Sequence, residues 1–442
     1  MNLDFRNVNS LWGSVLVETL VRAGLRQAVI SPGSRSAPLT IALARHPGVE
    51  AIPALDERSA AFFALGLARQ YGRPTLLVCT SGTAGANYLP AMIEARESGV
   101  PLLVITADRP PEMRACASGQ TIDQQKIFGD YPNFYHELAV PEAKWPLLRY
   151  LRQTVAHAWL RTFQPFAGPV HLNAPFRDPL SPIADGIAEE FAQAAEWISF
   201  FEHLEEGKLE IARGAPTPAF GGDVRGMIVA GPAQPPDPAA YAGYVGEIAR
   251  KLGWPVLADG LSPARQHASL IPRLITAYDA ILRDKAPAER LRPERVLCLG
   301  GWPTSKVLRG WLETSGAQIW IVSDQPDNRD ALHGRTQALP MSVRFLALVL
   351  AEPGEPNGYG QMWAREEQRV RSVLDERLGL ESSLFEPKAA WLLARHLPEA
   401  TPVFIANSMP VRDVEYVWPG TDRHLRPFFN RRWRSEIGRA HV

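Results

Sequence analysis

The sequence predicts an α/β protein whose domains are doubly wound parallel sheets. Short apolar runs of strand length alternate with amphipathic helical patterns over roughly the first 180 residues, and the alternation resumes near residue 226. Such alternation is typical of βαβ units, in which helices cover both faces of a parallel sheet. A chain of 442 residues is too long for one ordinary domain and suits two or three.

Composition excludes several classes of protein. The 47 basic and 47 acidic residues give no net charge, which argues against strongly electrostatic binding to nucleic acid or membranes. Cys79, Cys116 and Cys298 lie far apart and form neither a disulfide framework nor a CxxC metal motif. There is no signal-peptide pattern and no apolar run long enough to span a membrane. We therefore expect a cytoplasmic protein without nucleic-acid or membrane partners.

The first two helices are predicted from their start and stop signals. Asn9-Ser10 is expected to cap the first helix, which Gly24 ends, and a short strand follows at 27–30. Ser36 is expected to cap the second helix, with Pro38 in its first turn.

A carboxylate lies where the next strand meets a helix. The apolar run from Val49 to Leu55 predicts a buried strand, and a helix rich in Ala, Phe and Leu starts directly after Asp56 and Glu57. Helix capping by Asp56 and a favourable dipole interaction for Glu57 are sufficient reasons for two acidic residues there. The carboxyl ends of strands in an open α/β sheet are also where ligands bind, so Glu57 is a candidate functional residue.

The remaining pattern divides the chain. In the first half, further strands are expected at 75–80, 101–107, 134–140 and 170–173, with helices ending near 98 and starting near 147. In the second half, strands are expected at 227–232, 255–258, 295–300, 319–323 and 402–406, with helices at 346–350, 363–378 and 387–396. The predicted divisions are a first domain at 1–182, a connector at 183–222, a middle domain at 223–352, a linker helix at 353–386, an incomplete third domain at 387–431 and a non-native tail at 432–442.

Loops at successive strand ends place charged and polar groups at one edge of the first sheet. They comprise residues 31–36, 56–57, 80–83 and 108–111, and they supply a carboxylate, hydroxyls, helix N-termini, Arg35 and Arg109. Helix N-termini and arginine both favour carboxylate or phosphate groups, so this edge suits an anionic ligand. The alternative is a set of separate caps and turns with solvated arginines. The sequence contains no GxxxxGK[ST], strand-GxGxxG-helix, GxSxG or HExxH motif.

The motifs Ser31-Pro32-Gly33-Ser34-Arg35-Ser36, Asp56-Glu57-Arg58, Thr80-Ser81-Gly82-Thr83-Ala84, Thr106-Ala107-Asp108-Arg109-Pro110-Pro111-Glu112 and Asn407-Ser408-Met409-Pro410-Val411-Arg412 occur in this order. Together they resemble the MenD family, thiamine-diphosphate-dependent synthases of menaquinone and phylloquinone biosynthesis, from the first helix to about Arg431. The resemblance implies a pyrimidine-binding first domain, a Rossmann-like middle domain and a diphosphate-binding third domain. It also implies decarboxylation of 2-oxoglutarate, addition of the succinyl carbanion equivalent to isochorismate, and a homodimer or homotetramer.

The resemblance assigns roles to individual residues. Glu57 matches the glutamate that hydrogen-bonds N1′ of the aminopyrimidine and favours the imino tautomer, whose imine takes the C2 proton and leaves the thiazolium ylide. The matching cofactor-binding positions are Glu57, Ser81, Gly82 and Thr83. The matching substrate-binding positions are Ser34, Arg35, Arg109, Gln120, Lys306, Ser408, Arg412 and Arg431. A second basic residue that sometimes follows the lysine in the family is Val307 in this sequence.

The segment that binds Mg²⁺ and the cofactor diphosphate in the family, a Gly-rich turn followed by Gly-Asp and a downstream Asn, has no counterpart after Arg431. We therefore assign no metal ligand and expect the 442-residue chain by itself to be inactive. Two alternatives stay open: another thiamine-diphosphate 2-oxo-acid carboligase or decarboxylase, and a non-catalytic ligand-binding fragment.

Overall fold

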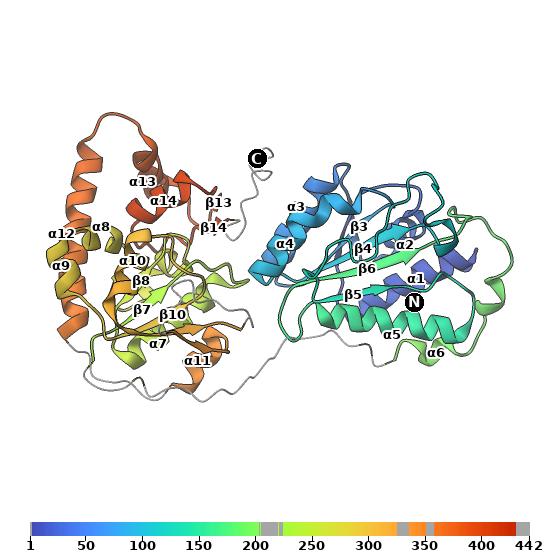
Figure 1. Ribbon diagram of the computed structural model, residues 1–442, viewed down its shortest axis with the longest axis horizontal. Helices are drawn as coiled ribbons and strands as arrows, with labels where there is room; N and C mark the ends of the chain where they lie inside the picture. Colours follow the sequence, from blue (N-terminus) through green and yellow to red (C-terminus); the bar gives the residue numbers. More distant parts are fainter. Residues whose placement is uncertain are drawn as a thin grey trace. The chain divides into compact units, whose positions relative to one another are not determined.

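The structure, a computed structural model, describes residues 2–202, 204, 220, 224–324, 336–350 and 358–429. These residues fall into two compact units, a first unit within residues 1–210 and a second unit within residues 211–431 (Figure 1). Each unit contains a six-stranded sheet, which confirms the predicted α/β class with parallel-sheet domains.

The first sheet has the strand order β2-β1-β3-β4-β6-β5, with every neighbouring pair parallel. Its strands are β1 (Gln27–Ile30), β2 (Glu50–Pro53), β3 (Thr75–Cys79), β4 (Leu102–Asp108), β5 (Phe134–Glu137) and β6 (Pro169–Pro175). The chain moves from β1 to β2 on one side and then to β3 on the other. The topological switch point, where ligands bind in open α/β sheets, therefore lies between β1 and β3.

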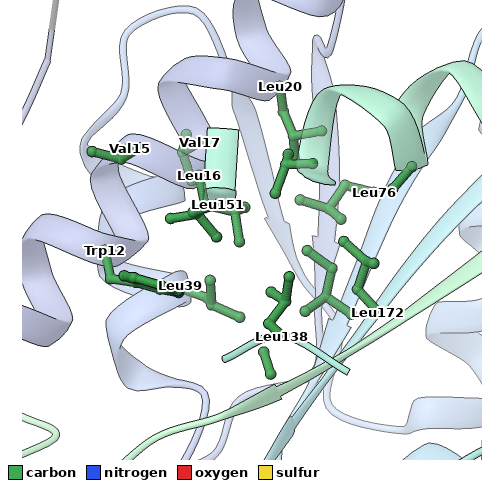
Figure 2. Close-up of a cluster of buried hydrophobic side chains, with 14 of the residues drawn as sticks. Trp12, Val15, Leu16, Val17, Leu20, Leu39, Leu76, Leu138, Leu151 and Leu172 are labelled. Carbon is green, nitrogen blue, oxygen red and sulfur yellow. The ribbon is translucent and has the colours of Figure 1, made fainter. Parts of the chain in front are cut away.

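Helices cover both faces of this sheet. They are α1 (Val8–Ala23), α2 (Ala37–Arg45), α3 (Glu57–Tyr71), η1 (Gly85–Tyr88), α4 (Leu89–Ser98), η2 (Pro111–Met113) and α5 (Trp145–Arg161). Alternate residues of the strands face opposite ways. Leu76 packs in one cluster with Leu16 of α1 and Leu151 of α5, whereas Leu77 packs with Ala61 of α3 and Met92 of α4. Figure 2 shows the first cluster, in which the α1, α2 and α5 side chains meet Leu76 and Leu172.

Two predicted caps are wrong in detail. Asn7, not Asn9-Ser10, caps α1, because its side chain accepts a hydrogen bond from the Ser10 amide. The Asn9 side chain instead donates to the carbonyls of Arg177 and Pro179. Ser36 occupies the N-cap position of α2 but makes no capping bond, since its hydroxyl donates to the Gly33 carbonyl. Gly24 ends α1 in the left-handed conformation, as predicted.

The strand before Glu57 was predicted to be buried, and this prediction is wrong. Strand β2 lies at the edge of the sheet, its end residues Glu50 and Pro53 are exposed, and Leu55 beyond it is 85% exposed. An apolar run alone does not distinguish an edge strand from a central one, because the neighbours on each side decide burial.

The interval expected to be a connector begins within the first unit. It contains η3 (Glu189–Phe191) and α6 (Trp197–Phe200). Trp197 is buried against Phe5 and Trp145, with ring centroids 6.0 and 4.8 Å away. The residues around Trp197 therefore add an aromatic layer to the first core.

The second sheet has the order β12-β11-β10-β7-β8-β9 and is also parallel throughout. Its strands are β7 (Gly226–Ala230), β8 (Val256–Ala258), β9 (Leu274–Ile275), β10 (Arg295–Leu299), β11 (Gln318–Val322) and β12 (Thr336–Leu339). Its helices are α7 (Pro238–Leu252), η4 (Pro263–Gln266), η5 (Ala268–Leu270), α8 (Tyr278–Arg283), α9 (Lys285–Arg290), α10 (Lys306–Ser315), α11 (Val343–Val349) and α12 (Gly358–Leu380). The edge strands β9 and β12 were not predicted.

A last segment belongs to the second unit. It contains α13 (Glu386–His396), β13 (Pro402–Phe404), α14 (Met409–Val417) and β14 (Arg426–Phe428), and the two strands pair in parallel. Leu261, after β8, shares a core with Leu378 and Trp418, so this segment packs on the middle sheet's domain. None of the helices in the described ranges combines the length and apolar character needed to cross a membrane.

Candidate active site at the carboxyl edge of the first sheet

The loops after β1, β2, β3 and β4 form a rim at the carboxyl edge of the first sheet, which we define as residues 31–36, 54–57, 80–84 and 108–112. At the switch point two of these loops touch. A Cβ atom on Gly33 would lie 2.3 Å from the Thr80 Cβ, so only glycine allows the approach. The Ser31 amide donates to the Val78 carbonyl at 2.8 Å, which joins the loop after β1 to strand β3.

Glu57 is the first residue of α3 and is half-buried. Asp56 caps the helix by accepting hydrogen bonds from the amides of Arg58 and Ser59, as expected, so Glu57 is not needed for capping. The charge of Glu57 is close enough to contribute to raising the pKa of Tyr88, whose main cause is burial. Within the described residues no hydrogen bond or ion pair engages the Glu57 carboxylate. This carboxylate is therefore available to a ligand at the rim.

Arg35 is a buried cation of the rim. Its Nη1 donates to the Phe176 carbonyl at 2.8 Å and lies 3.3 Å from Asp178, while its buried Nε has no hydrogen-bond partner in the structure. Burial lowers the pKa of Arg35, and the nearby charge of Arg109 lowers it further. The charge of Arg109 therefore acts on Arg35, and both cations belong to the rim.

Arg109, Ser81 and Gln120 meet on the other side of the switch point. The Arg109 Nη1 donates to the Ser81 hydroxyl, and the Gln120 side-chain amide donates to the Ser81 carbonyl at 3.0 Å. Ser81 is buried, whereas Gln120, Ser34 and Thr83 are exposed. The rim therefore presents polar side chains to solvent above a buried turn.

The backbone of Gly82 is held by a residue outside the predicted site. Its amide donates to the Gln124 side-chain oxygen at 2.8 Å, and its φ of 86° favours glycine. The amide is thus already paired within the protein. Sequence reasoning missed Gln124 and also Asn173, which contacts both Gln124 and Asp108. The only sequence signal was for Asn173, a polar residue within an apolar strand, and it gave no indication of a partner.

The remaining predicted residues belong to the second unit. Lys306 is the exposed first residue of α10, Ser408 is the exposed N-cap residue of α14, and Arg412 lies on α14. The loop before Lys306 donates from the Thr304 amide to Asp259, and the adjacent Gly260 amide donates to Glu415 of α14. These three residues therefore occupy elements that meet at the end of β8. Arg431 lies outside the described residues.

In the part of the chain that the structure describes, no group of three or more His, Cys, Asp or Glu residues could hold a metal ion. The unengaged Glu57 carboxylate fits the aminopyrimidine of thiamine diphosphate, which offers a ring nitrogen as a hydrogen-bond partner. The described residues thus fit the organic part of that cofactor and supply no metal cage.

Comparison with known families agrees with this geometry. Residues 12–127 match the family described as thiamine pyrophosphate enzyme, N-terminal TPP binding domain. Residues 211–405 match the family described as middle domain of thiamine pyrophosphate. The fold, the rim and these matches define a protein of the thiamine pyrophosphate enzyme class.

Three similar proteins identify the family within this class. A Synechococcus sp. protein is 53% identical over 97% of this chain and 74% of its own length. Proteins of Microcystis aeruginosa and Acaryochloris marina are 50% and 49% identical over 98% of this chain and 76% and 75% of their own lengths. All three are named 2-succinyl-5-enolpyruvyl-6-hydroxy-3-cyclohexene-1-carboxylate synthase. The chain belongs to the family of these synthases.

Proposed function

We propose that this protein carries out the synthase reaction, in which 2-oxoglutarate is decarboxylated and its succinyl fragment is added to isochorismate. The observation that carries the proposal is the set of groups on one rim: the unengaged Glu57 carboxylate, Arg35 with its unpartnered buried Nε, and Arg109 bonded to Ser81. Both substrates are dicarboxylates, and arginine is the side chain best suited to bind carboxylates in pairs of hydrogen bonds.

The residues of the first unit have separate proposed roles in binding the substrates and the cofactor. Arg35 and Arg109 bind substrate carboxylates, while Ser34 and Gln120 add exposed hydrogen-bonding groups beside them. Glu57 holds a proton at the aminopyrimidine nitrogen of the cofactor, and the turn 81–83 lines the cofactor site. Thiamine diphosphate, when bound, supplies the carbanion chemistry that protein side chains cannot provide.

Residues of the second unit are also proposed as substrate contacts. Lys306, Ser408 and Arg412 supply two cations and a hydroxyl for a second set of carboxylate contacts, and Arg431 is proposed for the same role. Mg²⁺ is proposed as the partner of the cofactor diphosphate, with no ligand assigned in this chain. A homodimer or homotetramer located in the cytoplasm completes the proposal.

A reconstitution experiment tests the function. We define the extended chain as residues 1–431 followed by the part of the Synechococcus relative beyond the matching region. Both this chain and the 442-residue chain would be incubated with isochorismate, 2-oxoglutarate, thiamine diphosphate and Mg²⁺. Mass spectrometry of the product is expected to show the synthase product with the extended chain only.

Each outcome has a separate meaning. A folded extended chain that binds thiamine diphosphate and converts another 2-oxo acid, but not 2-oxoglutarate with isochorismate, would contradict the proposed substrates. Turnover by the 442-residue chain alone would contradict the prediction that it is inactive. The stricter substrate control is Arg109→Met, which should lose carboxylate binding while retaining the fold.

A further inference from the structure

We propose that Gln124 and Asn173 are positioning residues, which hold the turn 81–83 and Arg109 at fixed places relative to each other through a buried chain of hydrogen bonds. Neither residue belongs to the predicted site. The contacts exist whatever the protein binds; their relevance to catalysis rests on the proposed function.

Gln124 connects the turn to the end of β4. Its side-chain oxygen accepts from the Gly82 amide at 2.8 Å, and its Nε2 donates to the Ala107 carbonyl at 3.1 Å. The same Nε2 lies 3.2 Å from Asn173 Oδ1. With a side chain only 1% exposed, Gln124 can make these contacts only with the protein.

Asn173 lies at the centre of the chain of hydrogen bonds. Its Oδ1 accepts from the Thr106 hydroxyl at 2.9 Å and from Gln124. Its Nδ2 donates to Asp108 at 2.9 Å and to Glu137 at 3.3 Å. Every hydrogen-bonding position of this fully buried amide is therefore used.

Asp108 carries the connection on to Arg109. One carboxylate oxygen accepts from the Arg109 amide at 2.7 Å, and the other accepts from Asn173 and from Arg114 at 2.9 Å. Asp108 is fully buried, so these bonds fix the backbone from which the Arg109 side chain projects towards Ser81.

Only one direction of hydrogen bonding fits this arrangement. A backbone amide at Gly82 requires the oxygen of Gln124, so its nitrogen must face Asn173 Oδ1, and the Asn173 nitrogen must then face the carboxylates. The Thr106 hydroxyl gives its only proton to Asn173, so the ring nitrogen of His171 at 2.8 Å is the donor to Thr106. Turning either amide over would place like groups against each other, and the buried donors would lose their partners.

The turn is also held from its outer side. Gln120 donates to the Ser81 carbonyl, and it does so from a backbone with φ of 55°, which is unusual for a residue other than glycine. The peptide group between Ser81 and Gly82 is therefore bonded at both ends. Gln120 donates to its carbonyl, and Gln124 accepts from its amide. Such double support is expected where the placement of a binding turn matters.

Hydrogen exchange on the 442-residue chain tests the proposal without any need for activity. Gln124→Met keeps the length of the side chain and removes its hydrogen bonds. Gln125→Met is the matched control, because Gln125 is exposed and, among the described residues, its side chain bonds only Glu137, a carboxylate that Asn173 also contacts, so the variant leaves every bond of Gln124 in place. We expect Gln124→Met to raise exchange at least tenfold in peptides covering 80–84 and 107–110, with peptides of α1 and β1 unchanged, and Gln125→Met to change neither.

Gln124→Glu separates the two halves of the chain of hydrogen bonds. It keeps an acceptor for the Gly82 amide and loses both donated bonds, so it should restore protection at 80–84 but not at 107–110. A uniform rise in exchange over the whole first unit in both variants would reveal a purely structural role and overturn the proposal. Unchanged exchange at 80–84 in Gln124→Met would overturn it as well.

Kinetics of the extended chain then measure the functional consequence. A displaced Arg109 weakens substrate binding more than it slows chemistry, so Gln124→Met should raise KM for a substrate at least tenfold with kcat within threefold. An equal fall in kcat with unchanged KM would contradict a positioning role for the substrate cations. If the extended chain has no synthase activity with any variant, the proposed function fails, whereas the exchange result still decides the positioning role.

Discussion

The two units use the same type of sheet for different ends. In the first unit, the carboxyl edge at the switch point ends in exposed polar groups, with the unengaged carboxylate of Glu57 and the rim cations Arg35 and Arg109. In the second unit, the chain's own α14 packs at the corresponding end of β8, where the Gly260 amide donates to Glu415. Backbone donors at a strand end can therefore serve a ligand or bind another part of the same chain.

The buried polar groups beside the two sheet edges differ in kind. The first unit pairs neutral amides with a carboxylate and arginine, and the hydrogen-bonding positions of Asn173 are all used. In the second unit the fully buried Arg265 donates to the carbonyls of Ala258 and Trp418 at 2.8 and 2.6 Å, and it lies 3.4 Å from the Glu415 carboxylate. The close contacts of Arg265 are thus to carbonyls, and the ion pair is the longer contact.

Replacing Glu57 gives the largest expected effect and tests whether the first rim is catalytic. Glu57→Gln removes the ability to take up and release a proton at the cofactor, and positioned acid–base groups contribute roughly 10²–10⁴-fold to rate. We expect kcat of the extended chain to fall by about that factor, with an unchanged thermal unfolding midpoint. Glu50→Gln, at an exposed position on β2, is the control and should retain full activity. Retention of activity by Glu57→Gln would remove the functional distinction between the two sheet edges.

The second expected effect is a pH dependence of stability in the second unit. Burial raises the pKa of Glu415 to about 8, helped by the charge of Asp259 and opposed by Arg265. Because the folded state then holds a proton that the unfolded state releases above its ordinary pKa, stability falls as pH rises from about 5 to 8. At 1.36 kcal/mol for each pKa unit, the loss is on the order of 4 kcal/mol.

Glu415→Gln tests this directly. A glutamine imitates the protonated carboxyl and can still accept from the Gly260 amide, so the variant should match the parent near pH 5 and exceed it near pH 8. Urea unfolding at both pH values measures the difference. Glu313→Gln, at an exposed position of α10, should change neither value. A variant that is less stable at pH 8 would mean that the Arg265–Glu415 ion pair stabilises the fold.

Alanine substitutions at two glycines compare a closely packed position with an open one. Gly33→Ala would place a Cβ against Thr80, and overpacking of this kind typically costs about 1–3 kcal/mol. Gly66→Ala lies on α3, where an added Cβ meets nothing within 4 Å, and should gain roughly 0.5–1 kcal/mol. Unfolding free energies of the two variants are expected to differ in sign. Equal effects would mean that the contact of the β1 and β3 loops does not determine the rim.

Sequence patterns predicted the strands and loops that depend only on residues close together in the chain. The strand at 27–30 is β1, because a short buried run between turn signals has few other solutions. Strands β9 and β12 were missed because one has two residues and the other is partly exposed at an edge. The rim loops followed from the rule that parallel strands share a carboxyl edge. Gln124 and Asn173 could not be predicted, since their contact depends on the register that places Thr106 beside Asn173.

The smallest expected effect concerns Ser408. It tests whether the second unit also presents a side chain to the substrate. Ser408 has φ 77° and ψ −122°, a conformation that favours glycine, and such a backbone costs on the order of 1–3 kcal/mol. Glycine loses more entropy on folding, so Ser408→Gly should gain only about 1 kcal/mol in stability, whereas Ser408→Ala should gain nothing. Unfolding of both variants measures this gain, and substrate titration of the extended chain measures what the hydroxyl contributes. If both variants bind substrate less tightly while only the glycine variant is more stable, the strained backbone of Ser408 is retained for the hydroxyl it presents. Unchanged binding in both would mean that α14 serves the second unit only by packing on the end of β8.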